Sequence, residues 1–200
     1  MKKIEERLEE LLKDFPGVGP RQAKRFLYFL IWKDNNYIKE FTDLLQLLRK
    51  NTKKCQSCNR IHFSSQNICE TCLDDNRIKE KLLIVEKNSD FENIEKTKLW
   101  KGQYFIIGKN LKLTEKEPEQ KINLEKLFRK IKENKVQEIT FALSLNPEGV
   151  NTMEWIKEML YPLQKEQGFK ISELARGISL GSEIEYIDKV TLEEALKNRK

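Results

Sequence analysis

The four cysteines of this 200-residue chain form two Cys-x-x-Cys pairs, and this spacing constrains the fold more than any other feature. The pairs are Cys55 with Cys58 and Cys69 with Cys72. Two thiolates separated by two residues can bind a metal ion from one tight turn, and two such pairs complete the tetrahedral four-sulfur shell that Zn²⁺ prefers. So short a segment has few large apolar side chains, and metal binding would supply the free energy that folds it. We therefore predict one structural zinc ion per chain.

The same cysteines could instead form two disulfide bonds in an oxidising compartment. The N-terminal residues lack the apolar segment and cleavage site typical of a secretory signal peptide, so we expect a cytoplasmic chain, where zinc is favoured. No apolar run reaches the ~18 residues that a membrane-spanning helix needs. Because a four-sulfur site leaves no coordination position for water, we expect the zinc ion to stabilise the fold and to have no catalytic role.

Positive charge is concentrated near the N-terminus. Residues 1–60 hold 14 Lys or Arg against 8 Asp or Glu, which accounts for the whole net charge of +6. Such an excess favours an anionic partner, most often nucleic acid, although many basic surfaces are merely solvated. The same segment contains three amphipathic helical patterns, and we expect the third, over residues 38–48, to complete a small core.

The first two helical patterns are joined by a Pro-Gly-Val-Gly-Pro turn. Gly17 and Gly19 leave its backbone amides uncovered, and such amides together with a helix N-terminus form an anion site. Arg21, Lys24 and Arg25 follow on the first turns of the second helix, where cations oppose the helix dipole unless an external anion neutralises them. We predict a helix-hairpin-helix element that binds a phosphate backbone without reading bases. The alternative is an ordinary Pro-Gly turn with its basic side chains in water.

Beyond the cysteines, short apolar runs of strand length alternate with helical patterns. Such alternation is typical of an α/β domain whose mostly parallel sheet is covered by helices on both faces. The expected strands are Lys81–Val85, Gln103–Ile107, Glu138–Leu143 and a further segment at Phe169–Ile171. We expect the helical pattern around Met153 to end near Pro162, and a final capped helix to run from Thr191 to Arg199.

Functional groups of a parallel sheet gather at the carboxyl ends of its strands. Glu86 follows the first strand, Asp90 lies four residues further along, and Asn146 follows the third strand. A Toprim domain holds Mg²⁺ at this edge with a lone glutamate and an Asp-x-Asp pair. This chain has Ser144 and Asn146 where the two aspartates belong. We therefore predict a Toprim-like domain without catalytic activity.

The order and spacing of these motifs resemble those of the RecR family of bacterial recombination proteins over nearly the whole chain. The motifs are P-G-V-G-P-R, the C-x-x-C pairs, L-L-I-V-E-x-x-x-D, G-x-Y, N-P-E-G, L-A-R-G-I-S-L-G-S-E-I-E-Y-I-D and T-L-E-E-A-L-K-N-R. The resemblance implies a non-catalytic, DNA-binding mediator of recombinational DNA repair, associated with the bacterial nucleoid. Such a protein would form a homo-oligomer, a tetrameric ring or a dimer. With RecO and RecF, it would help RecA replace single-strand-binding protein at DNA gaps.

The resemblance also implies roles for individual residues. The family's zinc ligands fall on Cys55, Cys58, Cys69 and Cys72. Its DNA-contacting positions fall on Arg21 and Arg25, and its partner-binding carboxylates on Glu86 and Asp90. Two segments depart from the family pattern: residues 111–120 are charged where a Gly- and Pro-rich loop is usual, and Ser172-Glu173 replaces Thr-Arg. These departures bear on partner affinity more than on fold.

Together the patterns predict an α+β protein of several modules. These are a helix-hairpin-helix DNA-binding domain (1–53), a four-cysteine zinc finger (54–76), a Toprim-like domain (79–167) and a C-terminal strand and helix segment (168–200). The residues alone leave two other functions open. One is a Mg²⁺-dependent Toprim enzyme, such as a nuclease or a primase-like protein, against which the missing Asp-x-Asp pair argues. The other is a zinc-bearing RNA-binding module, which the basic N-terminal residues would suit equally well.

Overall fold

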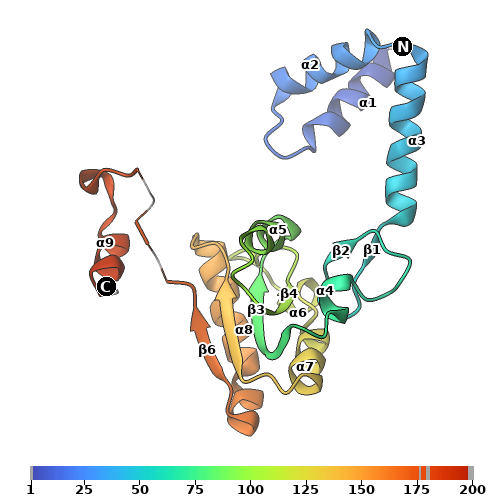
Figure 1. Ribbon diagram of the computed structural model, residues 1–200. Coiled ribbons are helices and arrows are strands. Elements are labelled where there is room, and N and C mark those ends of the chain that lie inside the picture. Colours follow the sequence, from blue (N-terminus) through green and yellow to red (C-terminus); the bar gives the residue numbers. More distant parts are fainter. Residues whose placement is uncertain (1, 176, 179–180, 198–200) are drawn as a thin grey trace. The chain divides into compact units, whose positions relative to one another are not determined.

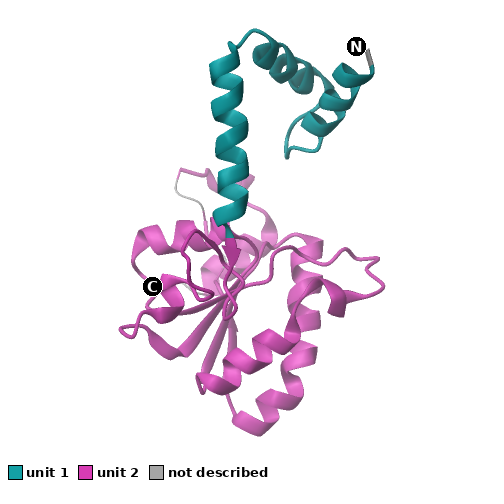
Figure 2. Ribbon diagram, turned by 90° about the vertical axis from the view of Figure 1, so that its right-hand side faces the viewer, with its two compact units in different colours: residues 1–52 teal, residues 53–200 magenta. Residues whose placement is uncertain are grey.

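The computed structural model describes residues 2–175, 177–178 and 181–197 (Figure 1). The chain divides into two compact units, Met1–Thr52 and Lys53–Lys200 (Figure 2). The secondary structure elements described in the first unit are helices, and the second unit is built on a parallel sheet. Among the described residues, no helix combines the length and the apolar character needed to cross a membrane.

Three helices make up the first unit: α1 (Lys2–Lys13), α2 (Pro20–Ile31) and α3 (Asn35–Asn51). Helices α1 and α2 form a hairpin around a small core of Leu12, Ala23 and Leu27, against which Val18 of the turn packs. Helix α3 begins after Asp34, whose carboxylate accepts a 2.8 Å hydrogen bond from the Tyr37 N–H.

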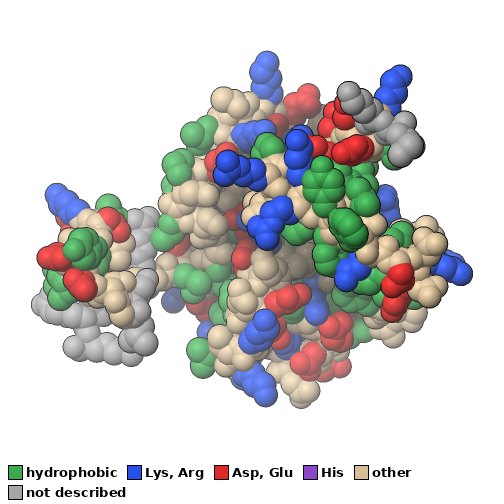
Figure 3. Space-filling model, turned by 90° about the horizontal axis from the view of Figure 1, so that it is seen from above, with side chains coloured by type: hydrophobic (Ala, Val, Ile, Leu, Met, Phe, Trp, Pro, Cys, Tyr) green, Lys and Arg blue, Asp and Glu red, His purple; other side chains and the backbone are tan. Residues whose placement is uncertain are grey.

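The third helix does not complete this core, contrary to the expectation from its periodicity. No residue of α3 is buried, and Phe41, Leu44 and Leu48 are 43%, 55% and 50% exposed. Near the start of α3, the Tyr37 ring lies 6.1 Å from that of Phe29 on α2, edge to face. Seen from above, hydrophobic side chains lie at the surface among those of Lys and Arg (Figure 3). Periodicity predicts which side chains share a helix face, but it does not predict what covers that face.

The second unit contains a four-stranded parallel sheet with the strand order β4-β3-β5-β6. Its strands are β3 (Ile78–Val85), β4 (Gly102–Ile106), β5 (Glu138–Ala142) and β6 (Lys170–Glu173). The connecting helices are α5 (Asn88–Thr97), α6 (Pro118–Lys121), α7 (Leu124–Glu133) and α8 (Pro147–Gln167). The prediction of a parallel sheet with intervening helices is confirmed.

Side chains of the central strand β3 are buried on both faces of the sheet. Leu82 and Ile84 belong to the larger core, which α7 and α8 cover. Leu83 and Val85 belong to a smaller core with Phe91 of α5 on the opposite face. Because successive strand residues point to opposite faces, burial on both sides explains why the second half of the strand, Leu82–Val85, is a continuous apolar run.

Helix α8 continues through Pro162 to Gln167, so the expectation that it ends near this proline is wrong. A proline inside a helix removes one backbone donor and costs about 3 kcal/mol. The turn that follows is held by Leu163, which is buried in the larger core. Gly168 then ends the helix in the left-handed conformation, with φ at +74°.

The C-terminal segment follows β6 with a 3₁₀ turn (Ile184–Tyr186) and helix α9 (Lys189–Lys197). This helix begins two residues before Thr191, where the sequence placed its start. The reason is that Asp188 caps the helix: its carboxylate accepts a 3.0 Å hydrogen bond from the Thr191 N–H. Three positions of the L-A-R-G-I-S-L-G motif and the expected helix end lie outside the described residues: Arg176, Ser179, Leu180 and residues 198–200.

Candidate functional site

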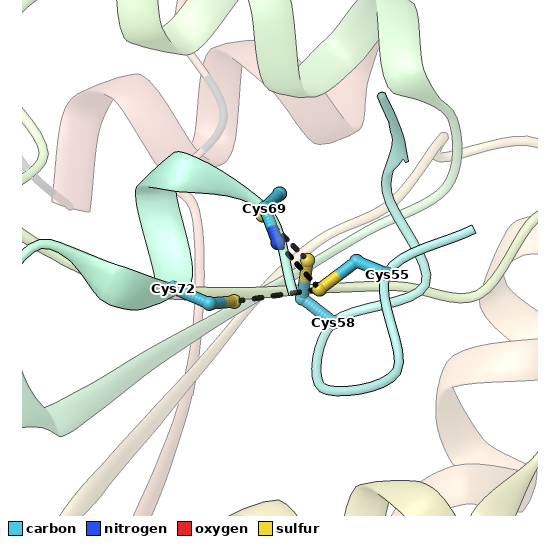
Figure 4. A group of neighbouring side chains, drawn as sticks. All are labelled: Cys55, Cys58, Cys69 and Cys72. Carbon is cyan, nitrogen blue, oxygen red and sulfur yellow. Dashed lines mark hydrogen bonds between the residues drawn. The ribbon is translucent and has the colours of Figure 1, made fainter. Parts of the chain in front are cut away.

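The four cysteines come together into one cluster, as their spacing predicts. The first pair lies between the short antiparallel strands β1 (Lys53–Lys54) and β2 (Ile61–His62), and helix α4 (Glu70–Leu73) positions the second pair. The four side chains point toward one another (Figure 4), and their sulfur atoms all lie within 4.8 Å. We call residues 53–73 the cysteine module.

The geometry of the cluster fits a tetrahedral metal ion. The sulfur atoms of Cys58 and Cys69 are 3.6 Å apart, and those of Cys55 and Cys72 are 4.0 Å apart. Around a tetrahedral zinc ion with Zn–S bonds of about 2.3 Å, neighbouring sulfurs are separated by about 3.8 Å. All four thiols are free. The residues present therefore match zinc in both ligand type and spacing.

Local hydrogen bonds shape the first cysteine turn. The backbone N–H of Cys55 donates to the Arg60 carbonyl at 2.7 Å, and the N–H of Cys69 donates to the Cys55 sulfur at 3.3 Å. Asn59 lies in the left-handed region with φ at +65°, which asparagine adopts more readily than most residues. Hydrogen bonds among the thiols lower the pKa of Cys55 and raise the pKa values of Cys58 and Cys69.

The cysteine module packs against the edge strand β4 and helix α7. The Ile106 N–H donates to the Cys58 carbonyl at 2.8 Å, and the Asn59 side-chain amide donates to the Ile106 carbonyl at 3.1 Å. Lys126 of α7 donates to the Asn59 side-chain oxygen at 2.8 Å. The two bonds to Ile106 pair its backbone groups on the outer edge of β4, which would otherwise be unpaired. Neither Asn59 nor Lys126 could be identified from the sequence, because their partners lie far away in the chain.

A second candidate site is the turn between α1 and α2. Gly17 has a φ of +77°, and a Cβ atom at Gly17 or Gly19 would meet nothing within 4 Å, so the backbone of the turn is open. Gly19 precedes α2 without a side-chain capping bond, and the first turn contains no acidic residue. Arg21, Lys24 and Arg25 are all exposed. The two glycines therefore lie on an open turn, and the three basic residues follow at exposed positions of α2.

The third candidate site lies at the carboxyl edge of the sheet, where Glu86 follows β3. Glu86 is only 5% exposed, and one carboxylate oxygen accepts 2.8 Å hydrogen bonds from the Ser144 hydroxyl and the Asn110 amide. The other oxygen pairs with Lys87 at 2.9 Å. Burial opposes ionisation, but the hydrogen bonds from Lys87, Ser144 and Asn110 outweigh it and lower the pKa of Glu86. Two neutral donors and the Lys87 ammonium thus satisfy this carboxylate.

Asp90 has a different role at the same edge. Its carboxylate accepts a 2.8 Å hydrogen bond from the Lys87 N–H and caps the first turn of α5. Asp90 also lines a cavity of about 410 Å³ beside the ends of β5 and β6, with Met153 and Glu173 among the other lining residues. Asn146, which the sequence placed here as well, caps α8 by accepting a 2.8 Å bond from the Gly149 N–H.

The two segments that depart from the RecR pattern are integrated into the second unit. Leu111, within the charged segment, is buried, and its N–H donates to the Thr152 hydroxyl at 2.7 Å. Glu173, the charge reversal, pairs with Lys157 of α8 at 2.6 Å. Both departures are therefore compatible with the fold of the second unit.

These features define a Toprim-domain protein with a four-cysteine cluster that can bind a metal. The Toprim domain family matches residues 80–175, and the family described as RecR, C-terminal, matches residues 177–200. The chain is 37% identical over 189 residues to recombination protein RecR of Mycoplasmopsis pulmonis (strain UAB CTIP), covering 94% of each chain.

Two further relatives carry the same name. Recombination protein RecR of Legionella pneumophila subsp. pneumophila (strain Philadelphia 1) is 35% identical over 194 residues, covering 96% of this chain and 94% of the relative. That of Cyanothece sp. (strain PCC 7425) is 30% identical over 194 residues, covering 97% and 94%. The chain belongs to the RecR family, which confirms the resemblance seen in its motifs.

Proposed function

We propose that this protein is a DNA-binding mediator of recombinational repair. The observation that carries the proposal is a sequence identity of 30–37%, over 94–97% of the chain, to proteins named recombination protein RecR. In this role it acts without catalysis, together with RecO and RecF, to help load RecA on DNA gaps coated with single-strand-binding protein. It works in the bacterial cytoplasm, at the nucleoid, as a homo-oligomer of two or four chains.

The hairpin between α1 and α2 is the proposed DNA contact. The open backbone at Gly17 and Gly19 and the exposed Arg21, Lys24 and Arg25 suit the phosphate backbone, which all DNA sequences share. The buried side of α2 faces α1, and this packing leaves the basic side chains in solvent. Binding of this kind has little sequence preference and depends strongly on salt concentration.

The carboxyl edge of the sheet is the proposed contact for a protein partner. Asp90 lines the cavity at this edge, where its charge would favour a basic partner and act mainly on association rate and specificity. Glu86 contributes by fixing Ser144 and Asn110, which its carboxylate holds. Mg²⁺ catalysis needs further carboxylates here, and this edge has neutral side chains at Ser144 and Asn146. An assembly platform is therefore favoured over an enzyme.

The proposed cofactor is one structural Zn²⁺ per chain, bound by the four cysteines. A complete four-sulfur shell leaves no open position for water, so the ion would contribute folding free energy and no chemistry. Its ligands would be Cys55, Cys58, Cys69 and Cys72, whose sulfur atoms are already within 4.8 Å of one another.

Replacing Arg21 and Arg25 together by alanine tests the proposed DNA contact. Each lost phosphate contact lowers the slope of log affinity against log salt concentration by about 0.9, so we expect a loss of up to about two. A matched control replaces Lys39 and Arg49, two exposed cations on α3, by alanine. Unchanged DNA affinity at low salt in the folded Arg21 and Arg25 double variant would remove the hairpin from the interface.

Two further measurements separate the competing functions. Structured RNA that displaces gapped DNA from the protein at equal concentration would favour the RNA-binding alternative. Mg²⁺-dependent strand cleavage or synthesis that disappears in the Glu86→Gln, Asp90→Asn double variant would favour a Toprim enzyme. We expect neither result, and we expect the double variant to lose partner recruitment while it keeps its DNA affinity.

A further inference from the structure

Helix α7 presents three basic side chains to the cysteine module. Lys126, Arg129 and Lys130 are spaced so that they share one helix face. Besides its bond to Asn59, the Lys126 ammonium lies 3.4 Å from the Cys55 carbonyl, and the Arg129 guanidinium reaches the next carbonyl of the chain at 3.4 Å. These two side chains contact the backbone and the amide of the first cysteine turn. Neither of these contacts involves a sulfur atom.

Lys130 differs from its neighbours because it is buried and contacts a sulfur. It is 3% exposed, and its ammonium nitrogen lies 3.6 Å from the Cys72 sulfur. The same nitrogen donates to the Ser57 hydroxyl at 2.8 Å and to the Gln103 side-chain oxygen at 3.3 Å. These three contacts match the three donors of an ammonium group.

The contacts of Lys130 leave one source for its counter-charge. Within the described ranges, neither an Asp nor a Glu is among its hydrogen-bond or ion-pair partners. Burying an ammonium group without an anion is costly. The hydroxyl and the amide that contact Lys130 are neutral, so among these contacts only the Cys72 sulfur can carry a compensating negative charge. A thiolate is also the form in which cysteine binds a metal.

The proposed zinc centre carries a negative charge and therefore needs a positive counter-charge. Zn²⁺ with four thiolates carries a net charge of about −2, which is costly to bury beside the parallel sheet. We propose that Lys130 is a positioning residue of this zinc centre: its ammonium donates an N–H···S bond to Cys72 and offsets part of the cluster's charge. This role rests on the zinc assignment made above. Through Gln103 of β4, the same lysine ties the metal centre to the sheet.

The position of Cys72 indicates what this bond does. Cys55, Cys58 and Cys69 are buried, whereas Cys72 is partly exposed. A chelator or water therefore reaches the metal first at Cys72. A hydrogen bond that stabilises this thiolate on the metal slows the first step of metal release, so Lys130 acts mainly on zinc retention.

The test compares zinc affinity in full-length variants. Lys130→Met keeps the aliphatic stem and removes the charge, and Lys130→Gln keeps N–H donors without the charge. Lys132→Met is the matched control, because Lys132 is exposed on the same helix. Loss of a side chain that orients a metal ligand costs about 10–100-fold in affinity. We expect a loss of that size in Lys130→Met, a smaller loss in Lys130→Gln and none in the control, measured by competition with a chromogenic chelator.

Cobalt substitution separates a direct effect on sulfur from a general loss of packing. When Co²⁺ replaces Zn²⁺, the thiolate-to-cobalt charge-transfer bands should move to lower energy in Lys130→Met and Lys130→Gln, because the Cys72 sulfur loses its cationic donor. The control should keep the wild-type spectrum. Unshifted bands and unchanged affinity in both Lys130 variants would overturn the role of Lys130. Wild-type protein that binds neither zinc nor cobalt would overturn the metal assignment itself.

Discussion

Replacing Glu86 by glutamine tests what stabilises the carboxyl edge of the sheet. The substitution preserves the side-chain shape of a residue that is 5% exposed, but it removes the charge. In the wild type, Ser144 and Asn110 each donate a 2.8 Å hydrogen bond to the same carboxylate oxygen. In the variant both bonds become neutral, and Lys87 faces an amide group in place of an anion.

The expected loss of stability follows from these bonds. A hydrogen bond to a charged group contributes about 1.5–3 kcal/mol and a neutral one about 0.5–1.5 kcal/mol, so two weakened bonds cost about 2 kcal/mol. The pair with Lys87 adds little, because that lysine side chain is 58% exposed. Glu86→Ala would leave both donors unpaired and open a cavity, and we expect it to cost about 4 kcal/mol.

Urea unfolding measures this loss. Trp32 belongs to the first unit, so a Trp32→Phe background leaves Trp100 and Trp155 as fluorescence reporters of the second unit. Glu86→Gln should lower the midpoint without changing the slope of the free energy of unfolding against urea. A loss below about 0.5 kcal/mol at neutral pH would refute the reasoning, because the edge would then not depend on a charged acceptor.

The difference in stability between wild type and Glu86→Gln should depend on pH. The pKa of Glu86 in the folded protein lies below its ordinary value of 4.5, so the unfolded chain binds the proton more readily. The resulting stability is present above pH 4.5 and is lost as the pH falls toward the folded-state pKa. The stability difference between wild type and Glu86→Gln should therefore shrink below pH 4.5. A constant difference across this window would contradict the ionised, hydrogen-bonded carboxylate.

Two further substitutions test the metal cluster and a tight backbone approach. Cys58→Ser should abolish zinc binding and unfold the cysteine module, because three thiolates cannot close the shell; zinc-free wild-type protein prepared without chelator would contradict this. A Cβ atom at Gly149 would lie 1.9 Å from the Ser144 carbonyl oxygen, so Gly149→Ala forces the backbone to shift. We expect this variant to destabilise the second unit by at least about 1–3 kcal/mol. Unchanged urea unfolding would argue against this close approach of the two segments.

The parts of the fold that local pattern controls could be predicted from the sequence. The cysteine cluster forms from ligands within one short segment, so their spacing was sufficient. The strand expected at Glu138–Leu143 is observed at Glu138–Ala142, because a strand buried on both faces has to be apolar at successive positions. Gly17 and Gly19 lie in an open turn, as expected because glycine has no side chain to cover the backbone amides.

The parts that depend on distant partners could not be predicted. A glutamate at a strand end has the same local sequence whether water surrounds it or, as for Glu86, a serine and an asparagine from other segments enclose it. The contact of Lys130 with Cys72 joins residues 58 positions apart, and no local periodicity encodes it. The continuation of α8 beyond Pro162 depends on burial of Leu163 in the larger core.

The packing of the cysteine module on β4 and α7 implies an order of assembly. The outermost cysteines are 17 positions apart, whereas the module's bonds to Ile106, Lys126 and Lys130 span 47, 67 and 73 positions. Short loops close at a lower entropy cost, and the module leaves the ribosome before the segments it contacts. A metal-held module would therefore be folded when β4 emerges, and it would offer backbone partners to that strand from the moment the strand forms. The sheet would then acquire its β4 edge already covered, and α7 would dock last onto both.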